Sequence, residues 1–256
     1  MRTLIYISIA YYIRFNTMKL LNLLPKKSRF MSMSLALLAS ATLLSSCLKS
    51  DNDDYQGPVS GISFVHAAAT QPSVGLFIDG RGIFNEAIKY GEFSQYLTAG
   101  SGNHLVQTTV GGTTQRLSEA TITLAEGKYH TVFVAHKAEN DSLTTVMTTD
   151  DLTAPATGKA KVRFVQLSPG TEEYDLHLQD GAMLADSKAY KESSTFTEIN
   201  PAKYKFVVRL AGAAEDAVVT EEVDVTAGRF YTVVLAGKAS VATGTTGALK
   251  AFTVAQ

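Results

Sequence analysis

The sequence lacks tryptophan, and its 256 residues include one cysteine and six prolines. One cysteine cannot form a disulfide within the chain, which excludes a small scaffold stabilised by disulfides. Basic and acidic side chains nearly balance, at 23 and 24, and 45% of the residues are hydrophobic. This average composition excludes collagen and low-complexity disorder. The length allows one large domain or two modest ones, so a globular protein is expected.

The small net charge conceals an uneven distribution along the chain. All charged residues before Cys47 are basic, namely Arg2, Arg14, Lys19, Lys26, Lys27 and Arg29. Removing these six from the 23 basic residues leaves 17 against 24 acidic ones, a net charge of −7 for the remainder. A region with this balance and no stripe of Lys or Arg cannot neutralise a run of phosphates. Nucleic acid is therefore not an expected partner.

Sequence strings that carry catalytic or cofactor chemistry are also missing. The chain has no Gly-x-Ser-x-Gly, no His-Glu-x-x-His, no cysteine pair and no phosphate-binding loop of the Walker type. Gly80 and Gly82 follow a predicted strand, but Asn85 stands where the dinucleotide fingerprint needs a third glycine. Neither an enzymatic activity nor a cofactor is expected.

The histidines and the paired carboxylates do not form a recognisable site. His130 and His136 fall on one face of a predicted strand, but six residues of strand separate them by about 20 Å, too far to share a metal ion. Paired carboxylates can hydrolyse a glycoside, but neighbours on a strand point to opposite faces, so adjacent acidic residues cannot converge on a sugar. They are expected in solvated turns or strand starts. These pairs are Asp150-Asp151, Glu172-Glu173 and Glu221-Glu222. No metal site is predicted.

The N-terminal region has the pattern of a secretory signal peptide, covering residues 1–46. Lys26, Lys27 and Arg29 precede an apolar run of about 15 residues, which small residues follow. A span needs about 20 residues, so this run is too short to cross a bilayer comfortably. Residues 1–17 form a further apolar segment, for which a second anchor is the competing interpretation. Met18 is the more natural start.

The string Leu44-Ser45-Ser46-Cys47 resembles the bacterial lipobox. The resemblance implies that Cys47 is lipidated on sulfur and becomes the first residue of the mature protein. Acyl chains contribute about 0.8 kcal/mol per buried CH₂, so two or three of them would hold the protein on a membrane. Membrane lipid is thus an expected partner, through acylated Cys47, and the predicted location is the outer membrane. The alternative is ordinary cleavage near an incidental cysteine.

Residues 47–60 are predicted to form an acidic linker behind the lipidated cysteine. The run resembles the export signal of surface-exposed lipoproteins of the Bacteroidota in these residues: Lys49, Ser50, Asp51, Asp53 and Asp54. The resemblance implies display at the cell surface, and the alternative is a plain solvated tether. Tyr55 stands where a calcium loop needs its third oxygen ligand, which excludes that loop.

Residues 61–155 and 159–256 repeat one pattern at an offset of 100 to 101. The segment 62–66 (ISFVH) recurs as 162–166 (VRFVQ), and 124–135 recurs as 225–236. Such ordered matches predict a tandem duplication, with the breaker-rich junction 150–158 between the copies. His66 ends a predicted strand, where its imidazole can bond a neighbouring carbonyl, and Gln166 can play the same part in the second copy.

Each copy is predicted to consist of strands. Runs rich in Val, Ile, Thr, Tyr and Phe alternate with turn-forming clusters such as Asp79-Gly80 and Asp180-Gly181. In the first copy the predicted strands lie near 61–66, 73–79, 88–97, 103–110, 119–124, 128–136 and 143–149. Seven short strands are typical of an immunoglobulin-like fold. The predicted class is all-β, with two tandem immunoglobulin-like antiparallel β-sandwich domains, 61–155 and 159–256, after the signal peptide.

The second copy carries motifs that resemble a known family. Residues 162–169 (VRFVQLSP), the strand at 174–176 and the Gly-x-Tyr/Phe-x-Thr-Val strand are similar to the family catalogued as domain of unknown function 4397. The first copy departs from the motif, with residues 69–72 (ATQP) in place of Ser-Pro. The resemblance covers 61–256 and implies a tandem β-sandwich on exported, often lipid-anchored proteins. It implies no chemistry.

Two further features suggest surface chemistry. Tyrosines near predicted loops can stack on sugars or anchor protein contacts, and the candidates are Tyr90, Tyr96 and Tyr190. Asp141-Ser142-Leu143 resembles the O-glycosylation site of exported Bacteroidota proteins, which implies modification of Ser142. The alternative for these three residues is a polar turn.

These observations favour a non-catalytic lipoprotein of the cell envelope. Its predicted role is that of a surface-displayed binding or adhesion module for a glycan or protein. The alternative is a structural or assembly subunit, fimbria-like or part of an envelope complex, that acts through β-strand pairing.

Overall fold

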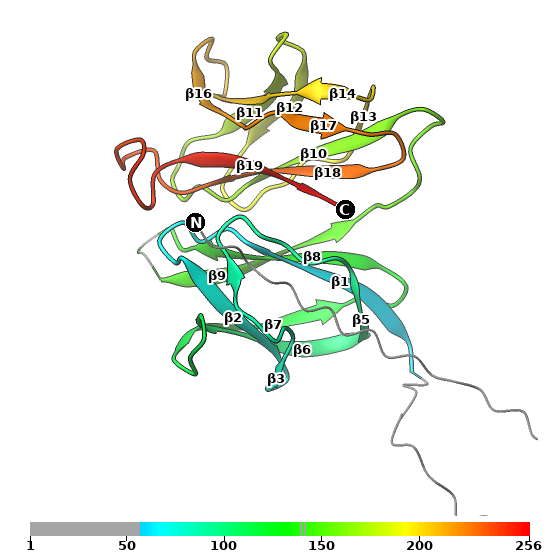
Figure 1. The fold of residues 1–256 in the computed structure, drawn as a ribbon, viewed down its shortest axis with the longest axis vertical. Helices are drawn as coiled ribbons and strands as arrows, with labels where there is room; N and C mark the ends of the chain where they lie inside the picture. Colours follow the sequence, from blue (N-terminus) through cyan, green and yellow to red (C-terminus); the bar gives the residue numbers. More distant parts are fainter. Residues whose placement is uncertain (1–56, 139, 141) are drawn as a thin grey trace, which may run out of the picture. The chain divides into compact units, whose positions relative to one another are not determined.

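A computed structural model of the chain describes residues 57–138, 140 and 142–256, and every regular element in it is a β-strand (Figure 1). The predicted all-β class is therefore confirmed. No helix among these residues is long and apolar enough to cross a membrane. We call residues 59–150 the first half and residues 160–255 the second half, and no strand lies between them.

The first half contains nine strands in two sheets. One sheet has the order β5-β1-β8-β9, and the other has the order β3-β2-β6-β7 with β4 paired to β2. The strands are β1 Val59–His66, β2 Ser73–Ile78, β3 Arg81–Gly82, β4 Ile88–Lys89, β5 Leu97–Gly100, β6 Gly102–Val110, β7 Arg116–Leu124, β8 Tyr129–His136 and β9 Leu143–Asp150.

The second half contains ten strands in three sheets. Their orders are β13-β10-β18-β19, β12-β11-β15-β16 and β14-β17. The strands are β10 Ala160–Gln166, β11 Tyr174–Leu178, β12 Met183–Lys188, β13 Thr197–Ile199, β14 Ala202–Tyr204, β15 Phe206–Leu210, β16 Asp216–Val219, β17 Val223–Val225, β18 Phe230–Ala236 and β19 Lys250–Ala255.

Strands β1 and β8 are buried on both faces, which explains their unbroken apolar runs. Successive side chains of a strand point to opposite faces. Phe64 therefore packs between the two sheets of the first half, whereas Val65 belongs to another cluster, which also contains Val165 and Val234 of the second half. The sheets β5-β1-β8-β9 and β13-β10-β18-β19 thus pack against each other, and we call them the inner sheets.

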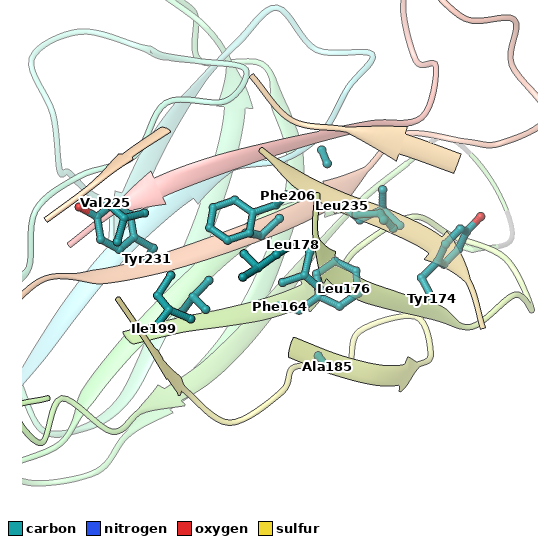
Figure 2. Close-up of a cluster of buried hydrophobic side chains, with 14 of the residues drawn as sticks. Phe164, Tyr174, Leu176, Leu178, Ala185, Ile199, Phe206, Val225, Tyr231 and Leu235 are labelled. Carbon is teal, nitrogen blue, oxygen red and sulfur yellow. The ribbon is translucent and has the colours of Figure 1, made fainter. Parts of the chain in front are cut away.

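The second half has its own core behind its inner sheet (Figure 2). Phe164 of β10 meets Leu176 of β11 and Phe206 of β15 there, and all three are fully buried. Burying a side chain of this size contributes about 1.5–3 kcal/mol relative to leaving it exposed. This cluster fixes the inner sheet from the side that faces away from the first half.

The two inner sheets share one strand order and one unusual pairing. In each, a parallel pair forms the centre: β1 with β8, where Gly61 is in register with Tyr129, and β10 with β18, where Lys161 is in register with Phe230. The prediction of antiparallel sheets is therefore wrong for these two pairs, while the other strand pairs of the inner sheets are antiparallel. The described residues belong to one compact unit. The tandem duplication, its immunoglobulin-like topology and the domain limits 61–155 and 159–256 stay predictions.

The prediction of one strand over 88–97 is wrong. Only Ile88–Lys89 and Leu97–Gly100 are strands there, and they belong to different sheets: β4 pairs with β2, and β5 pairs with β1. Gly91 adopts a φ of 85° between them, a left-handed conformation that glycine reaches without strain. The segment crosses from the sheet β3-β2-β6-β7 to the inner sheet of the first half, so it cannot continue as a single strand.

Candidate functional site

A hollow of about 360 Å³ opens at the first residues of β1, β5 and β8. We call it the tyrosine hollow. It is lined by Val59, Ser60, Gly61, Tyr96, Leu97, Thr98, Gly127, Lys128 and Tyr129. Three strands of one inner sheet position these residues, because β1 lies between β5 and β8 in that sheet (Figure 1).

The tyrosine hollow gathers exposed apolar side chains. Tyr129 is 44% exposed, Val59 42% and Leu97 38%, and they are half of the large hydrophobic residues found exposed in the described part of the chain. Exposed apolar side chains that share one hollow offer a surface that a ligand or partner can cover. The hollow is therefore the strongest candidate for a binding site.

Gly61 allows the ring of Tyr129 to lie against the backbone of β1. A Cβ atom added to Gly61 would lie 2.4 Å from Cδ1 of Tyr129, a distance that real side chains do not reach. Any other residue at this position would push the ring away. The glycine thus sets the position of the exposed aromatic face.

Tyr96 supports the same ring from the side. The Tyr96 and Tyr129 rings meet edge to face, with centroids 5.1 Å apart and planes at 77°. The Tyr96 hydroxyl donates a hydrogen bond of 2.6 Å to Oδ2 of Asp150. Burial, followed by the nearby Asp150 carboxylate, raises the pKa of Tyr96 well above its ordinary value. Tyr96 therefore remains a hydrogen-bond donor and holds its ring in place.

Asp150 in turn belongs to a buried network that reaches the second half. It accepts hydrogen bonds from the hydroxyls of Thr131 and Thr148, and its Oδ1 lies 2.5 Å from Nη1 of Arg163. The Arg163 guanidinium lies over the ring of Phe196, 4.7 Å from the centroid. The support of the tyrosine hollow is thus continuous with the contact between the inner sheets.

The second half carries a closed counterpart of the tyrosine hollow. Phe196 and Phe230 meet edge to face at 5.3 Å, as Tyr96 and Tyr129 do. Lys161 stands in place of Gly61, with its Nζ 5.8 Å from the centre of the Phe230 ring. Phe230 is only 9% exposed. Of these two aromatic pairs, the one in the first half has an open face and the one in the second half is covered.

The polar groups of the tyrosine hollow are suited to binding. The side chains of Thr98 and Lys128 are exposed at its rim, while the Ser60 hydroxyl donates to the carbonyl of Ala125. The residues that line it include no carboxylate, imidazole or thiol. Its ionisable side chains are those of Lys128, Tyr96 and Tyr129.

A larger groove, of about 1080 Å³, lies elsewhere on the described chain. Residues 69–72 of the first half border it together with β16 and the segment 239–250 of the second half. Its lining consists mostly of small residues such as Ala217 and Gly244. The groove offers space for an extended segment and no cluster of charged groups.

The residues predicted to direct export and lipidation lie outside the described residues. They are Leu44, Ser45, Ser46, Cys47, Lys49, Ser50, Asp51, Asp53 and Asp54. The whole signal peptide 1–46 and residues 47–56 of the linker 47–60 lie outside them as well. All of these stay predictions.

Ser142 lies at an exposed turn before β9. Its backbone N–H donates a hydrogen bond of 2.9 Å to Oδ1 of Asn140, and its hydroxyl also donates to this oxygen. These bonds are those of a polar turn. Glycosylation of Ser142 stays a prediction.

The three tyrosines selected from the sequence are partly buried, and Tyr96 lines the tyrosine hollow while Tyr90 lines the larger groove. Tyr90 packs edge to face against His66 and Phe252, and burial raises the pKa of Tyr90 to about 12. Tyr190 donates its hydroxyl to the carbonyl of His136. Tyr90 and Tyr190 thus make contacts between the two halves, whereas Tyr96 contacts Tyr129 and Asp150 within the first half. The ring exposed at 44% is that of Tyr129, and the change from Gly61 to Lys161 at the matching position was the signal that could have indicated it.

The hydrogen-bonding role predicted for His66 and Gln166 is confirmed. Nε2 of His66 lies 3.0 Å from the carbonyl of Gln71, and Nδ1 accepts from the N–H of Ala68. Gln166 repeats both bonds: its Nε2 donates to the carbonyl of Glu172, and its Oε1 accepts from the N–H of Ser168. Burial lowers the pKa of His66 to about 4.

His130 and His136 are buried, at 1% and 2% exposure. Nε2 of His130 accepts from the N–H of Ala125, and Nε2 of His136 accepts from the N–H of Thr70. Within the described ranges, no group of three His, Cys, Asp or Glu side chains could hold a metal ion.

The interpretation of the acidic pairs as solvated is wrong for Asp150. This residue is 5% exposed and paired with Arg163, whereas its neighbour Asp151 is exposed. Strand β9 ends at Asp150, so Asp151 lies beyond the strand and outside this buried network. The pairs Glu172-Glu173 and Glu221-Glu222 are exposed, as expected.

Residues 60–177 match the family described as "Domain of unknown function (DUF4397)". The match covers the first half and ends within β11, so the resemblance over residues 178–256 stays a prediction. No curated protein sequence matches the chain.

Two solved structures resemble the chain at low sequence identity. One is CBMbc of family CBM26 from Eubacterium rectale Amy13K in complex with maltoheptaose, with 11% identity, 77% of this chain and 96% of that chain covered, and a TM-score of 0.24. The other is a "Putative cell adhesion protein" from Parabacteroides distasonis ATCC 8503, with 8% identity, coverage of 77% and 98%, and a TM-score of 0.21. Both TM-scores are too low to inform the site or ligand of this chain.

Proposed function

We propose that this chain is a non-catalytic lipoprotein that is displayed on the cell surface and binds a glycan or protein ligand. The observation that carries the proposal is the exposed ring of Tyr129, which Gly61 and Tyr96 hold in the tyrosine hollow. A tyrosine offers a large contact area at low conformational cost, and a fixed one costs least to order on binding.

A non-catalytic role agrees with the chemistry of the buried polar groups. Asp150 is engaged with Arg163, and His66, His130 and His136 accept hydrogen bonds from the backbone. Catalytic groups need access to a substrate, and these four side chains are buried. Their bonds serve the structure.

The anchor belongs to the proposal through Cys47 and the lipobox resemblance around it. Residues 48–59 reach at most about 40 Å, at roughly 3.3–3.6 Å per extended residue. The tyrosine hollow begins at Val59. A lipid on Cys47 would therefore keep the hollow within about 40 Å of the membrane surface.

The test uses cells that express the full chain. We compare the unchanged chain with Tyr129→Ala, Tyr129→Phe and the control Met183→Ala, which removes a 55% exposed side chain of β12. Retention of cells on surfaces coated with glycans or matrix proteins is expected to fall for Tyr129→Ala alone. A non-permeant protease should release peptides of residues 57–256 equally from all four strains.

Two results would contradict the proposal. One is equal retention of Tyr129→Ala cells at equal display. The other is protection of residues 57–256 from the protease until the outer membrane is opened, which would place the protein on the periplasmic side.

A second candidate function is assembly through strand pairing. Strand β16 is an edge of its sheet, borders the groove of about 1080 Å³, and carries Val219, which is 44% exposed. Edge strands of this kind can accept a strand from another chain. Polymers of the full chain seen by electron microscopy, abolished by Val219→Lys and unaffected by Tyr129→Ala, would favour this function over the first.

A further inference from the structure

We infer that the tyrosine hollow binds one hexopyranosyl residue of a glycan, with the C–H face of the sugar ring against Tyr129. The inference rests on the proposed binding function and assigns its ligand. It follows from the size of the hollow, the chemistry of its walls and the comparison between the two halves.

The size of the tyrosine hollow favours a small ligand. Its volume of about 360 Å³ lies at the lower end of the range for small-molecule sites, roughly 300–1,000 Å³. A stable protein interface needs about 800 Å² per partner with a well-packed core. Three exposed apolar side chains, Val59, Leu97 and Tyr129, are too few for such a core. They suffice to cover one face of one ring.

The chemistry of the tyrosine hollow matches a sugar ring. A hexopyranose carries C–H groups on its faces and hydroxyls around its rim. The exposed π face of Tyr129 is electron-rich and attracts polarised C–H groups, while hydroxyls prefer polar neighbours. The side chains of Thr98 and Lys128 stand at the rim of the hollow, where they can meet those hydroxyls. The arrangement thus offers an apolar floor and a polar edge.

The exposed ring is held in place before any ligand arrives. Gly61 fixes its distance from β1, and Tyr96 fixes its edge through the hydrogen bond to Asp150. A fixed ring loses little conformational freedom on binding, so the entropy cost of ordering it does not cancel the weak contacts with a sugar.

The second half shows how the same arrangement is closed. Lys161 replaces Gly61 and places its ammonium near the Phe230 ring, where a ligand would otherwise stack. The Lys161 ammonium also donates to the carbonyl of Thr153, which fixes the side chain. One sugar per chain is therefore expected.

Hexopyranosyl residues can come from two sources at this position. One is the polysaccharide of the cell's own envelope, since the proposed anchor keeps the tyrosine hollow near the membrane. The other is a glycan that reaches the surface from outside. Both present the same ring chemistry, so the experiment has to separate them.

The experiment uses the full chain in a detergent without a sugar headgroup. Saturation-transfer NMR is recorded with methyl β-glucopyranoside, methyl β-galactopyranoside and methyl α-mannopyranoside, and then with two polysaccharide pools. The first pool is released from the expressing cells, and the second is prepared from mucin. Titration gives the dissociation constant and the stoichiometry.

The expected result is saturation of the C–H protons on one face of at least one glycoside, with one site per chain. Loss of the stacking ring in Tyr129→Ala should raise the dissociation constant at least about tenfold, whereas Tyr129→Phe should stay within about threefold. Met183→Ala should leave it unchanged. Binding of the cell-derived pool or of the mucin pool supports the inference and identifies the source.

Failure of the inference can be told apart from failure of the proposed function. If no glycoside and neither pool binds, or if Tyr129→Ala binds as well as the unchanged chain, the inference is overturned. If cells are then still retained on a protein-coated surface in a Tyr129-dependent way, the binding function survives with a protein ligand. If Tyr129 matters in neither assay, both proposals fail.

Discussion

Arg163 and Asp150 form a buried ion pair that joins the two halves of the protein. Nη1 of Arg163 lies 2.5 Å from Oδ1 of Asp150, and their side chains are 3% and 0% exposed. Arg163 also donates to the hydroxyl of Thr232 on β18, and Tyr96 donates to Asp150 from the tyrosine hollow. The pair therefore links the stability of the sheet contact to the position of the exposed ring.

Removing one partner of this pair should destabilise the protein strongly. Arg163→Met leaves Asp150 charged and buried without its counterion, and breaking such a pair costs about 3–5 kcal/mol. The free energy of unfolding, measured by guanidinium titration of the full chain, should fall by this amount. The matched control is Lys203→Ala, which breaks the exposed pair with Glu222 and should cost less than about 1 kcal/mol. An equal decrease in the free energy of unfolding in both variants would show that the buried pair contributes no more to stability than the exposed pair.

The buried imidazole of His66 should make the protein less stable in acid. Burial lowers the pKa of His66 to about 4, from an ordinary value of 6.5. The unfolded chain then takes up a proton before the folded chain does. The contribution of the neutral imidazole is complete above about pH 6.5 and is lost as the pH falls toward 4. Since one pKa unit corresponds to about 1.4 kcal/mol, the loss reaches about 3 kcal/mol near pH 4.

The variant His66→Gln provides the check, because the second half already uses glutamine at the matching position. Gln166 makes the same two hydrogen bonds, so the replacement should preserve the fold while removing the titration. Guanidinium unfolding at pH 7.5 and pH 4.5 measures the difference. His66→Gln should lose less stability between these two pH values than the unchanged chain. An identical loss in both proteins would mean that other groups cause the acid sensitivity.

Features that depend on local pattern could be predicted from the sequence. The apolar runs at 61–66 and 128–136 are strands because both of their faces are buried, and the His66 and Gln166 bonds follow from two polar residues at matching strand ends. In both cases the residue types along a short segment carry the signal.

Features that depend on residues far apart in the sequence could not be predicted. Asp150 looks like half of a solvated pair until β9 brings it to Arg163 across the contact between the halves. Likewise, nothing local distinguishes Tyr129 from the ten other tyrosines. Its exposure depends on Gly61, which stands 68 positions earlier and becomes its neighbour only when β1 pairs with β8.

The proposed anchor gives a prediction that does not depend on the tyrosine hollow. Cys47→Ala removes the sulfur that would carry the lipid, so the protein should leave the membrane fraction and appear in the soluble fraction of fractionated cells. A metabolic label with an alkyne-tagged fatty acid should mark the unchanged chain and not the variant. Ser142→Ala serves as the control, because it removes a hydroxyl without affecting the cysteine. Labelled, membrane-bound Cys47→Ala would contradict the lipoprotein assignment.

Exchanging the residues at 61 and 161 should close the open site and open the closed one. In Gly61→Lys, the new Cβ falls 2.4 Å from Cδ1 of Tyr129, so the ring must move and sugar binding should be lost. In Lys161→Gly, the cover of Phe230 is removed, and a second site should appear. Glycine within a strand costs roughly 0.5–1 kcal/mol, which a thermal melt should register as a small decrease.

The measurement is the number of sugar sites per chain from titration: none for Gly61→Lys, one for the unchanged chain and two for Lys161→Gly. Because Phe230 lacks the tyrosine hydroxyl, a second site that matches the affinity of the first would show that the ring face alone provides the contact. A Lys161→Gly chain that melts normally but still binds one sugar would mean that the difference between the halves lies beyond residue 161, in Thr98, Lys128 or their neighbours. Binding that persists in Gly61→Lys would show that Tyr129 does not need its place over β1.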